Sequence, residues 1–364
     1  AAGSISAPFF GTYVNLMADH LTLKHGPVAR VACFGGCVVI ATVAFALQSM
    51  RWAGPSLFWT MLVCRIPLAS CTTTCASLLD AITVQGLSDR RLYSQERVFG
   101  AYGWALMGLF LGRLMDRWGT RVMHVCMPLA ALSVGVALVL AGRPPQRLAE
   151  DTLASLTTSR TSRGFLQLLK YYLSSIALVS FFVFAVTLGV GMVLVENLLF
   201  MYFRELGSTY FVCGMSVVVT VCFEIPLFWV SRWLLDTLGS RGLLVVGGLC
   251  YSFRVIGYTL CPGGAWVLIF EPMHGVTYAA WQMASVEVMA SITPPELAAT
   301  GQTFLQSLRG GVGSTLGNLC GGLVIQAYGE ATLYRGAAGL VMLGLLFYLA
   351  ANHRRPVPTM PSVM

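Results

Sequence analysis

Long apolar runs recur along the whole chain, and they constrain its fold more than any other feature of the sequence. Runs of roughly 18 or more residues with few charges are typical of helices that span a membrane. The composition agrees, because 56% of the residues are hydrophobic and only 10% are charged, whereas about 25% are charged in a soluble domain. The sequence therefore predicts an all-α, polytopic membrane helix bundle.

About eleven segments have the length of a membrane span, at about 20 residues each. They lie near 1–18, 28–48, 56–79, 97–113, 121–141, 172–202, 209–233, 242–260, 265–291, 298–325 and 332–351. The polar segment 142–170, rich in Pro, Ser, Thr and Arg, separates the first five spans from the last six. We therefore expect an N-terminal bundle at 1–141, a cytoplasmic linker, a C-terminal bundle at 171–352 and a cytoplasmic tail at 353–364.

The two expected bundles differ by about 40 residues, which is the length of one helix and its loop. Because the chain begins inside an apolar stretch, "AAGSISAPFFG", we expect that a first helix is absent from it and that the complete architecture is six plus six. Two turns support internal repetition, since "LMDRWGTR" (114–121) and "LLDTLGSR" (234–241) share the pattern L-x-D-x-x-G-[ST]-R. Lys and Arg gather in the loops of one side, which predicts a cytoplasmic C-terminus.

The charge and the cysteines argue against several other classes of protein. The net charge of +8 comes mostly from arginines at the ends of apolar runs, and no basic patch with interleaved aromatic residues indicates nucleic-acid binding. The eleven cysteines are scattered and form no CxxC motif, so we expect neither a zinc site nor a disulfide framework. The sequence indicates no cofactor and no metal.

Several stretches resemble a known family of membrane transporters. They are "FEIPLFWVSRWLLDTLGSRGLLVVGGLCYSFRVIGY", "FEPMHGVTYAAW", "ITPPELAATGQTFLQSLRGGVGSTLGNLCGG" and "LLDA" (78–81). Together with the repeated D-x-x-G-[ST]-R turns, they are similar to the major facilitator superfamily, in the branch of lactose permease and the nucleoside–proton symporters. Within it, the chain is most similar to the eukaryotic proteins called major facilitator superfamily domain-containing. This resemblance implies the major facilitator fold of twelve helices, a central cavity and alternating access, and it leaves the substrate open.

Two opposite charges lie at equal depth in neighbouring spans. The turn "LCPGGA" joins the spans at 242–260 and 265–291, and Arg254 and Glu271 are equally far from its centre. At a rise of 1.5 Å per residue, both lie about 13 Å along their helices from the turn. We expect the two side chains to pair, because pairing offsets part of the cost of burying a charge.

A polar stripe extends from Glu271 along the same span. On an α-helix, His274, Tyr278, Gln282 and Ser285 fall within roughly 80° of one another and of Glu271, as a wall facing water would require. One interpretation is a static lock between Arg254 and Glu271. The other is a proton site, since a nearby Arg changes the proton affinity of a buried carboxylate and His titrates near neutrality.

The resemblance supports the second interpretation, since the lactose permease branch uses an Arg, His and Glu cluster for proton coupling. There the His precedes the Glu, whereas Glu271 precedes His274 in this chain. A metal interpretation is weaker. Glu-x-x-His is half of a di-iron site, and such a site needs a second Glu-x-x-His and two further Glu residues.

Further polar residues are candidates for contact with substrate. Gln302, Gln306 and Arg309 have the spacing of one helix face. Glu224 precedes Pro226, so its carboxylate either serves transport or satisfies backbone groups that the proline leaves free. Asp80 lies near the inner end of a span, where capping is the alternative to function. Gly313, Gly317 and Gly321, spaced by four residues, predict close helix packing.

These observations favour a multi-pass transporter that moves a polar organic solute together with protons. The alternative is a polytopic receptor or scaffold that keeps the fold without transport. An intramembrane enzyme is not expected, because no nucleophile accompanies Glu271 and His274. We expect a small-molecule solute, protons and the lipid bilayer as partners, and location in the plasma membrane or an endomembrane.

Overall fold

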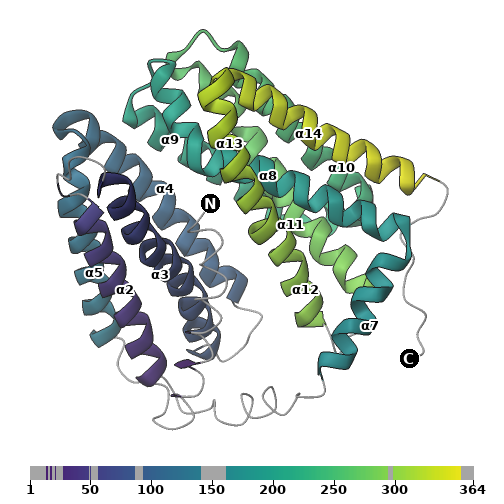
Figure 1. The fold of residues 1–364 in the computed structure, drawn as a ribbon, viewed down its shortest axis with the longest axis horizontal. Coiled ribbons are helices and arrows are strands. Elements are labelled where there is room, and N and C mark those ends of the chain that lie inside the picture. The colour runs from purple at the N-terminus through teal and green to yellow at the C-terminus, as the bar shows by residue number, and fades with distance from the viewer. Residues whose placement is uncertain are drawn as a thin grey trace. The chain divides into compact units, whose positions relative to one another are not determined.

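Helices make up all the regular structure of the residues that the computed structural model describes (Figure 1). These residues are 28–48, 50, 56–86, 93–140, 161–293 and 298–353, with Val14, Met17, Ala18 and Leu21. The chain divides into two compact units, the first made of Ala1–Gly100 with Arg117–Ser159 and the second of Ala101–Asp116 with Arg160–Met364. In the described residues of the first unit, the helices with defined bounds are α2 (Val28–Gln48), α3 (Ser56–Gly86), the start of α4 (Tyr93–Trp118), η2 (Thr120–Val122) and α5 (Met123–Leu140).

The first unit is built around the packing of α2 on α3. Buried residues recur along α2 at intervals of three and four, namely Phe34, Cys37, Ala41 and Ala44. That interval places them on one helix face, which packs against Leu68, Cys71 and Leu78 of α3. The rest of α2 carries exposed apolar side chains such as Val39 and Val43, as expected for a helix in contact with lipid.

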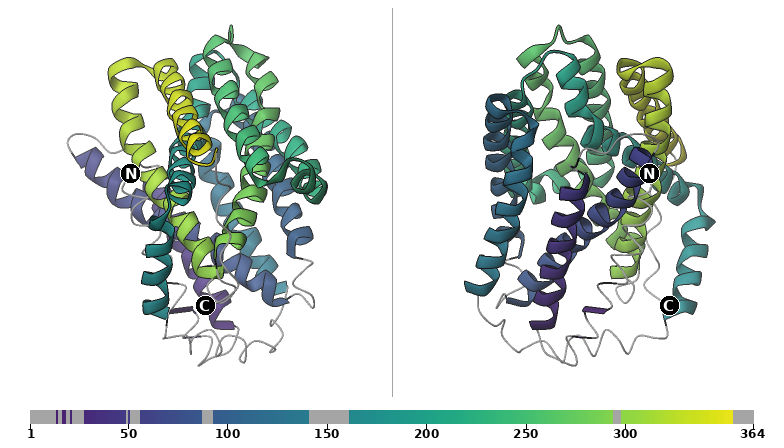
Figure 2. Two further views of the ribbon diagram at one scale, coloured as in Figure 1. Left: turned by 90° about the vertical axis from the view of Figure 1, so that its right-hand side faces the viewer. Right: turned by 60° about the vertical axis from the view of Figure 1, so that its left-hand side comes forward.

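The second unit contains the remaining part of α4 and all later helices. They are α7 (Thr161–Ser174), α8 (Ile176–Glu205), α9 (Tyr210–Trp229), α10 (Ser231–Leu260), η3 (Gly264–Phe270), α11 (Pro272–Ile292), α12 (Ala298–Gln306), η5 (Ser307–Gly313), α13 (Ser314–Tyr328) and α14 (Glu330–Ala351). Figure 2 shows α7, in teal, leading into the start of α8.

Helix α8 is the centre of the second unit (Figure 1). Its side chains are buried on most of its circumference, and Phe181 stacks on Trp281 of α11 while Phe184 stacks on Tyr348 of α14. Such aromatic contacts add to the stability that the buried apolar area provides. The core of this unit therefore joins α8 to the helices that carry the candidate site.

Close packing of α13 and η5 on α8 depends on the predicted glycines. A Cβ atom at Gly313 would lie 2.9 Å from the backbone O of Val186, and one at Gly321 would lie 2.5 Å from Cδ2 of Leu194. At Gly317 it would lie 2.9 Å from the backbone O of Val190. Backbone atoms leave no room for a side chain at Gly313 and Gly317, whereas at Gly321 the end of the Leu194 side chain would have to move; the prediction of close packing is confirmed.

Six helices in the described part of the chain are long and apolar enough to cross a membrane, and a shorter apolar segment covers Leu57–Thr72. The six are Val31–Gln48, Thr120–Ala137, Ile176–Glu205, Tyr210–Trp229, Ser231–Leu260 and Glu330–Ala351. The total of eleven spans stays a prediction. The expected span at 1–18 falls almost entirely outside the described residues, as do most of the linker and of the tail.

The structure differs from the expected boundaries at three places. The end of the expected linker belongs to α7, an amphipathic helix that begins at Thr161. The expected span at 265–291 begins with the 3-10 helix η3, and its α-helix starts only at Pro272, a residue that favours the first helical position. Within the span at 298–325, residues Ser307–Gly313 form a π-helix. Apolar patterning does not distinguish these helix types.

The two similar turns serve different purposes. Asp116 at the end of α4 accepts hydrogen bonds from the backbone N–H groups of Tyr210 and Phe211, each at 2.7 Å, and so caps the start of α9. In the other turn, Gly239 has φ 66° and bends α10. Arg241, directly beyond the bend, donates to the backbone O of Asn352 at 3.2 Å, where α14 ends. One turn caps a helix start and the other caps a helix end.

Candidate functional site

The candidate site lies where α9, α10 and α11 meet, at the hairpin predicted from the sequence. The chain leaves α10 at Leu260, turns at Gly263 with φ 108° and Gly264 with φ 65°, and enters η3. Both φ values belong to the left-handed region that glycine adopts without strain. Glu271 follows η3 and directly precedes Pro272, so its side chain projects from the junction of a 3-10 helix and an α-helix.

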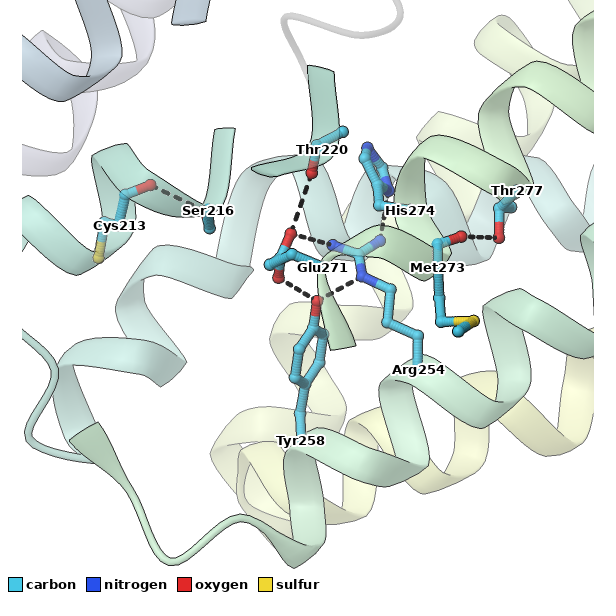
Figure 3. Close-up of polar contacts among 9 residues, drawn as sticks. All are labelled: Cys213, Ser216, Thr220, Arg254, Tyr258, Glu271, Met273, His274 and Thr277. Atoms are coloured by element: carbon cyan, nitrogen blue, oxygen red, sulfur yellow. Dashed lines mark hydrogen bonds and ion pairs between the residues drawn. The ribbon is translucent and has the colours of Figure 1, made fainter. Parts of the chain in front are cut away.

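Arg254 and Glu271 form a buried ion pair (Figure 3). Nη2 of Arg254 lies 3.4 Å from Oε2 of Glu271, and the two side chains are 1% and 2% exposed. The pairing expected from equal depth is thus present. At this burial each charge depends on the other, because a lone charge in a dry environment is strongly unfavourable.

Neighbouring side chains complete the hydrogen bonding of the carboxylate. The hydroxyl of Tyr258 donates to Oε1 of Glu271, and the hydroxyl of Thr220 donates to Oε2 at 3.1 Å. Nε of Arg254 donates to the same Tyr258 hydroxyl. Glu271 therefore accepts three hydrogen bonds, as expected of an ionised carboxylate.

His274 binds the remaining end of the guanidinium group. Nη1 of Arg254 faces Nδ1 of His274 at hydrogen-bonding distance. A guanidinium group can only donate, so Nδ1 must accept and the ring proton must lie on Nε2. His274 is thus a neutral imidazole in this arrangement, and Arg254 has an acceptor on each of its three nitrogens.

A glycine lets α9 approach this cluster. A Cβ atom at Gly275 would lie 2.7 Å from the backbone O of Thr220 and 2.8 Å from the backbone N of Glu224. Because Gly275 has no side chain, the backbones of α9 and α11 come close enough for Thr220 to reach Glu271. The cluster thus depends on three helices, although its charged members come from one hairpin.

The remaining predicted residues lie along the helices around this cluster. Tyr278 packs its ring edge-to-face on Phe228 at 6.4 Å between centroids, and Gln282 is half-buried one turn further along α11. Ser285 is buried. Glu224 is half-buried where α9 passes Gly275. Glu287, which the sequence places on the opposite face of α11, is exposed.

The predicted residues Gln302, Gln306 and Arg309 lie in two kinds of helix, α12 and η5, and their common face stays a prediction. The side-chain N–H of Gln302 donates to the backbone O of Val286 at 3.3 Å, toward α11, while Gln306 is exposed. Arg309 lies in the π-helix, where hydrogen bonds join i to i+5 and the α-helical count of about 100° per residue no longer applies. Asp80 belongs to α3, and its side chain lies outside the described part of the structure.

Sequence reasoning missed Tyr258 and Thr220. Tyr258 follows Arg254 by four residues, so the two share a face of α10, and this spacing is a signal that could have identified it. Thr220 is 51 positions from Glu271 in the sequence, and no local pattern marks it. Its place depends on how α9 packs on α11.

Comparisons with known proteins agree with the fold. The MFS_1 like family matches residues 2–336. The human "Major facilitator superfamily domain-containing protein 6-like" is 28% identical over 165 residues, 44% of this chain and 28% of that protein, and its Mus musculus counterpart is 28% identical over 186 residues, 50% of this chain and 31% of that protein. The chain thus matches less than a third of the length of these relatives.

Solved transporter structures show the same fold. The nucleoside transporter NupG has a TM-score of 0.72 at 15% identity, covering 96% of this chain and 88% of that chain. A D-xylose-proton symporter has a TM-score of 0.67 at 14% identity, covering 98% and 86%. With several helices apolar enough to span a bilayer, the protein is an integral, multi-pass membrane protein. The match over most of the chain shows that it belongs to the MFS_1 like family, in the major facilitator superfamily.

Proposed function

We propose that the protein is a secondary active transporter that carries a polar organic solute and protons by alternating access, with Glu271 as the proton site. The family and the fold support a transporter rather than an enzyme. One observation carries the proton-coupling part of the proposal, namely the buried ion pair between Glu271 and Arg254, which lies in the apolar, span-length helix α10. Ionisable residues in spans are costly and usually serve transport or proton relay.

The cluster has the parts that a proton switch needs. Glu271 is ionised while it accepts hydrogen bonds from Arg254, Tyr258 and Thr220. A proton on Glu271 removes the negative charge that compensates the buried guanidinium, so this arrangement becomes unfavourable. The proton then favours a conformation in which Arg254 finds another acceptor or reaches water. Protonation and helix movement are coupled in this way.

His274 has a supporting part in the proposal. Its neutral ring accepts a hydrogen bond from Arg254, so a proton on Nδ1 would replace that attraction with repulsion between two cations. His274 therefore holds Arg254 toward Glu271 only while it is uncharged. Tyr278, Gln282 and Glu224 continue the polar surface from this cluster, and we assign them to contact with the solute.

The organisation expected from the sequence is part of the same proposal. Five spans at 1–141 and six spans at 171–352, joined by a cytoplasmic linker at 142–170, would place the cluster at mid-depth in the second group. The C-terminal tail at 353–364 would lie in the cytoplasm. Fusion of a reporter after Met364 tests the orientation, and a reporter in the 261–264 turn should lie on the opposite side of the membrane.

The deciding experiment compares Glu271→Gln with Glu287→Gln in vesicles loaded with a pH-sensitive dye. Gln keeps the shape of Glu and removes its titration, and Glu287 provides as control an exposed carboxylate on α11, the helix that begins directly after Glu271. Solute-driven acidification of the vesicles should be lost in Glu271→Gln and retained in Glu287→Gln. Equal acidification by both variants contradicts the proposal.

A receptor or scaffold on the same fold is the second candidate. The observation that favours it is that the match covers less than a third of the length of the curated relatives, so the unmatched parts of those proteins have room for another role. Binding of a solute by the purified protein with no movement of that solute into vesicles would support this candidate.

A further inference from the structure

A second pair of opposite charges lies in the same unit, away from the Arg254 cluster. Glu196 of α8 is exposed, although it lies well inside a membrane-spanning helix. Among the described residues it has no ion-pair partner. Its carboxylate is attracted by the positive charge of Arg309 in η5 and, to a smaller extent, by that of Arg254. An exposed charge within a span faces the interior of a bundle or water rather than lipid.

The backbone of Arg309 in η5 packs against the face of α8 that also carries Glu196. Gly189 precedes Glu196 by seven residues, two helical turns, so the two residues point the same way. A Cβ atom at Gly189 would lie 3.0 Å from Cα of Arg309, so the backbones of the two helices touch there. Glu196 therefore stands about 10 Å along α8 from the backbone of Arg309, at 1.5 Å per residue. In the described structure the two side chains do not meet as an ion pair across that separation.

Arg309 lies in a π-helix, and one of its N–H groups donates no hydrogen bond in the described structure. It lies in the π-helix Ser307–Gly313, a helix type that occurs frequently at functional sites. Its Nε is buried and has no hydrogen-bond partner in the described structure. A buried donor without an acceptor costs roughly 1–3 kcal/mol, and a ligand that supplies the acceptor removes this cost.

Two hydrogen-bonded amide side chains lie next to Glu196. Asn197 follows Glu196 on α8, and its side-chain N–H donates to Oδ1 of Asn318 on α13 at 2.8 Å. Asn318 in turn donates to the backbone O of Ser314 at 2.9 Å. This chain of hydrogen bonds fixes the Asn197 side chain, which is exposed and keeps its own carbonyl oxygen as an acceptor.

We propose that Glu196 and Arg309 bind the two ends of a zwitterionic solute, its ammonium group at Glu196 and its carboxylate at Arg309. The inference rests on the proposed transport function and names the class of the solute. A solute with one charge would form an ion pair with only one of the two residues, and a neutral solute would form none. A carboxylate also fits the fork of donors on a guanidinium group. The amide of Asn197 would orient the ammonium end.

The test measures thermal stabilisation of the full 364-residue chain in detergent by zwitterions of increasing charge separation. Glycine, β-alanine, 4-aminobutyrate, 6-aminohexanoate and alanyl-alanine are compared with butyrate, butylamine and an equimolar mixture of these two. A ligand that binds only the folded state stabilises it by RT ln(1 + [L]/Kd), so the dissociation constant follows from a titration. At least one zwitterion should stabilise the protein where the single-charge compounds and their mixture do not.

Matched variants connect the effect to the two residues. Glu196→Gln and Arg309→Gln should weaken binding of that zwitterion about ten- to a hundredfold, as expected for loss of one charge-assisted hydrogen bond. Glu287→Gln and Arg335→Gln, an exposed acid and an exposed base elsewhere in the unit, should bind it as the unchanged protein does. Equal weakening in the control variants overturns the inference, as does a panel in which no zwitterion exceeds the single-charge compounds.

Glu271→Gln separates this inference from the proposed function. It should retain zwitterion binding and lose proton coupling, because Glu271 is not among the proposed solute ligands. If zwitterions bind and no proton moves with them, the proton-coupling proposal fails and the solute class stands. If protons move with a neutral solute and zwitterions do not bind, the solute class fails and the proton role of Glu271 stands.

Discussion

The two charge pairs of the second unit contrast in almost every physical respect. Arg254 and Glu271 come from one hairpin, are buried, and have their hydrogen bonds completed by Tyr258, Thr220 and His274. Glu196 and Arg309 come from helices far apart in the sequence, and in the described structure neither forms an ion pair. In our two proposals, a proton breaks the fully hydrogen-bonded pair of Arg254 and Glu271, whereas a ligand completes the pair of Glu196 and Arg309.

Removal of Arg254 should have the largest effect on stability. Arg254→Ala leaves the Glu271 carboxylate buried without its counter-charge, a change that costs about 3–5 kcal/mol for a broken buried pair. The melting temperature in detergent, measured with a dye that reports exposed cysteine, should fall strongly. The double variant Arg254→Ala with Glu271→Ala should be more stable than Arg254→Ala alone. A double variant that loses the sum of both single effects would show that the pair is not coupled.

Substitution at Gly275 should separate α9 from the cluster. A side chain at Gly275 would meet the backbone O of Thr220 at 2.7 Å, so Gly275→Val forces the two helices apart. Overpacking of this kind costs about 1–3 kcal/mol. Gly339→Val on α14 is the control, because nothing lies within 4 Å of a Cβ atom there. The two melting temperatures are compared, and equal values would contradict the close approach of α9 and α11.

Loss of the Tyr258 hydroxyl tests the pair of Arg254 and Glu271 without removing a charge. Tyr258→Phe keeps the ring in the core and takes one donor from Glu271 and one acceptor from Arg254. A lost bond of this kind, with a charged partner, costs about 1.5–3 kcal/mol. Tyr328→Phe, at a residue 72% exposed, should leave the free energy of unfolding unchanged. Equal effects of the two variants would mean that the hydroxyl of Tyr258 does not stabilise the pair.

The smallest effect is expected at Glu196. Glu196→Gln removes an exposed carboxylate that has no ion-pair partner in the described structure, so its effect on stability should stay within about 0.5 kcal/mol. The same substitution at Glu271 should destabilise the protein, because Arg254 then loses its counter-charge. Thermal melting of the two Glu→Gln variants in parallel measures this difference. A large loss at Glu196 would show that the second pair also has a structural role.

The sequence predicts those parts of the site that depend on local geometry. Arg254 and Glu271 could be paired because one hairpin sets both depths, and the spacing of Gly313, Gly317 and Gly321 indicates close packing because it follows one helix face. What it could not predict depends on contacts between helices distant in the chain. Thr220 reaches Glu271 only after α9 packs on α11.

Helix type was the second limit on prediction. The apolar pattern of 298–325 is continuous, yet Ser307–Gly313 bonds as a π-helix, so the α-helical count that predicts a common face for Gln302, Gln306 and Arg309 does not extend to Arg309. A Cβ atom at Gly310 or Gly311 would meet nothing within 4 Å, so these two glycines are not sites of close packing. The pattern of apolar residues records which side is buried and does not record how tightly the backbone is wound.

The 3-10 helix before Glu271 gives the hairpin spare length. A 3-10 helix rises about 2.0 Å per residue and an α-helix about 1.5 Å, so the seven residues of η3 extend roughly 3.5 Å further than the same residues would in an α-helix. The two forms also differ by about 20° per residue in rotation, or roughly 140° over the segment. Because Pro272 follows Glu271 directly, rewinding η3 would shift and rotate Glu271 together with the start of α11, and it would change the distance of Glu271 from Arg254.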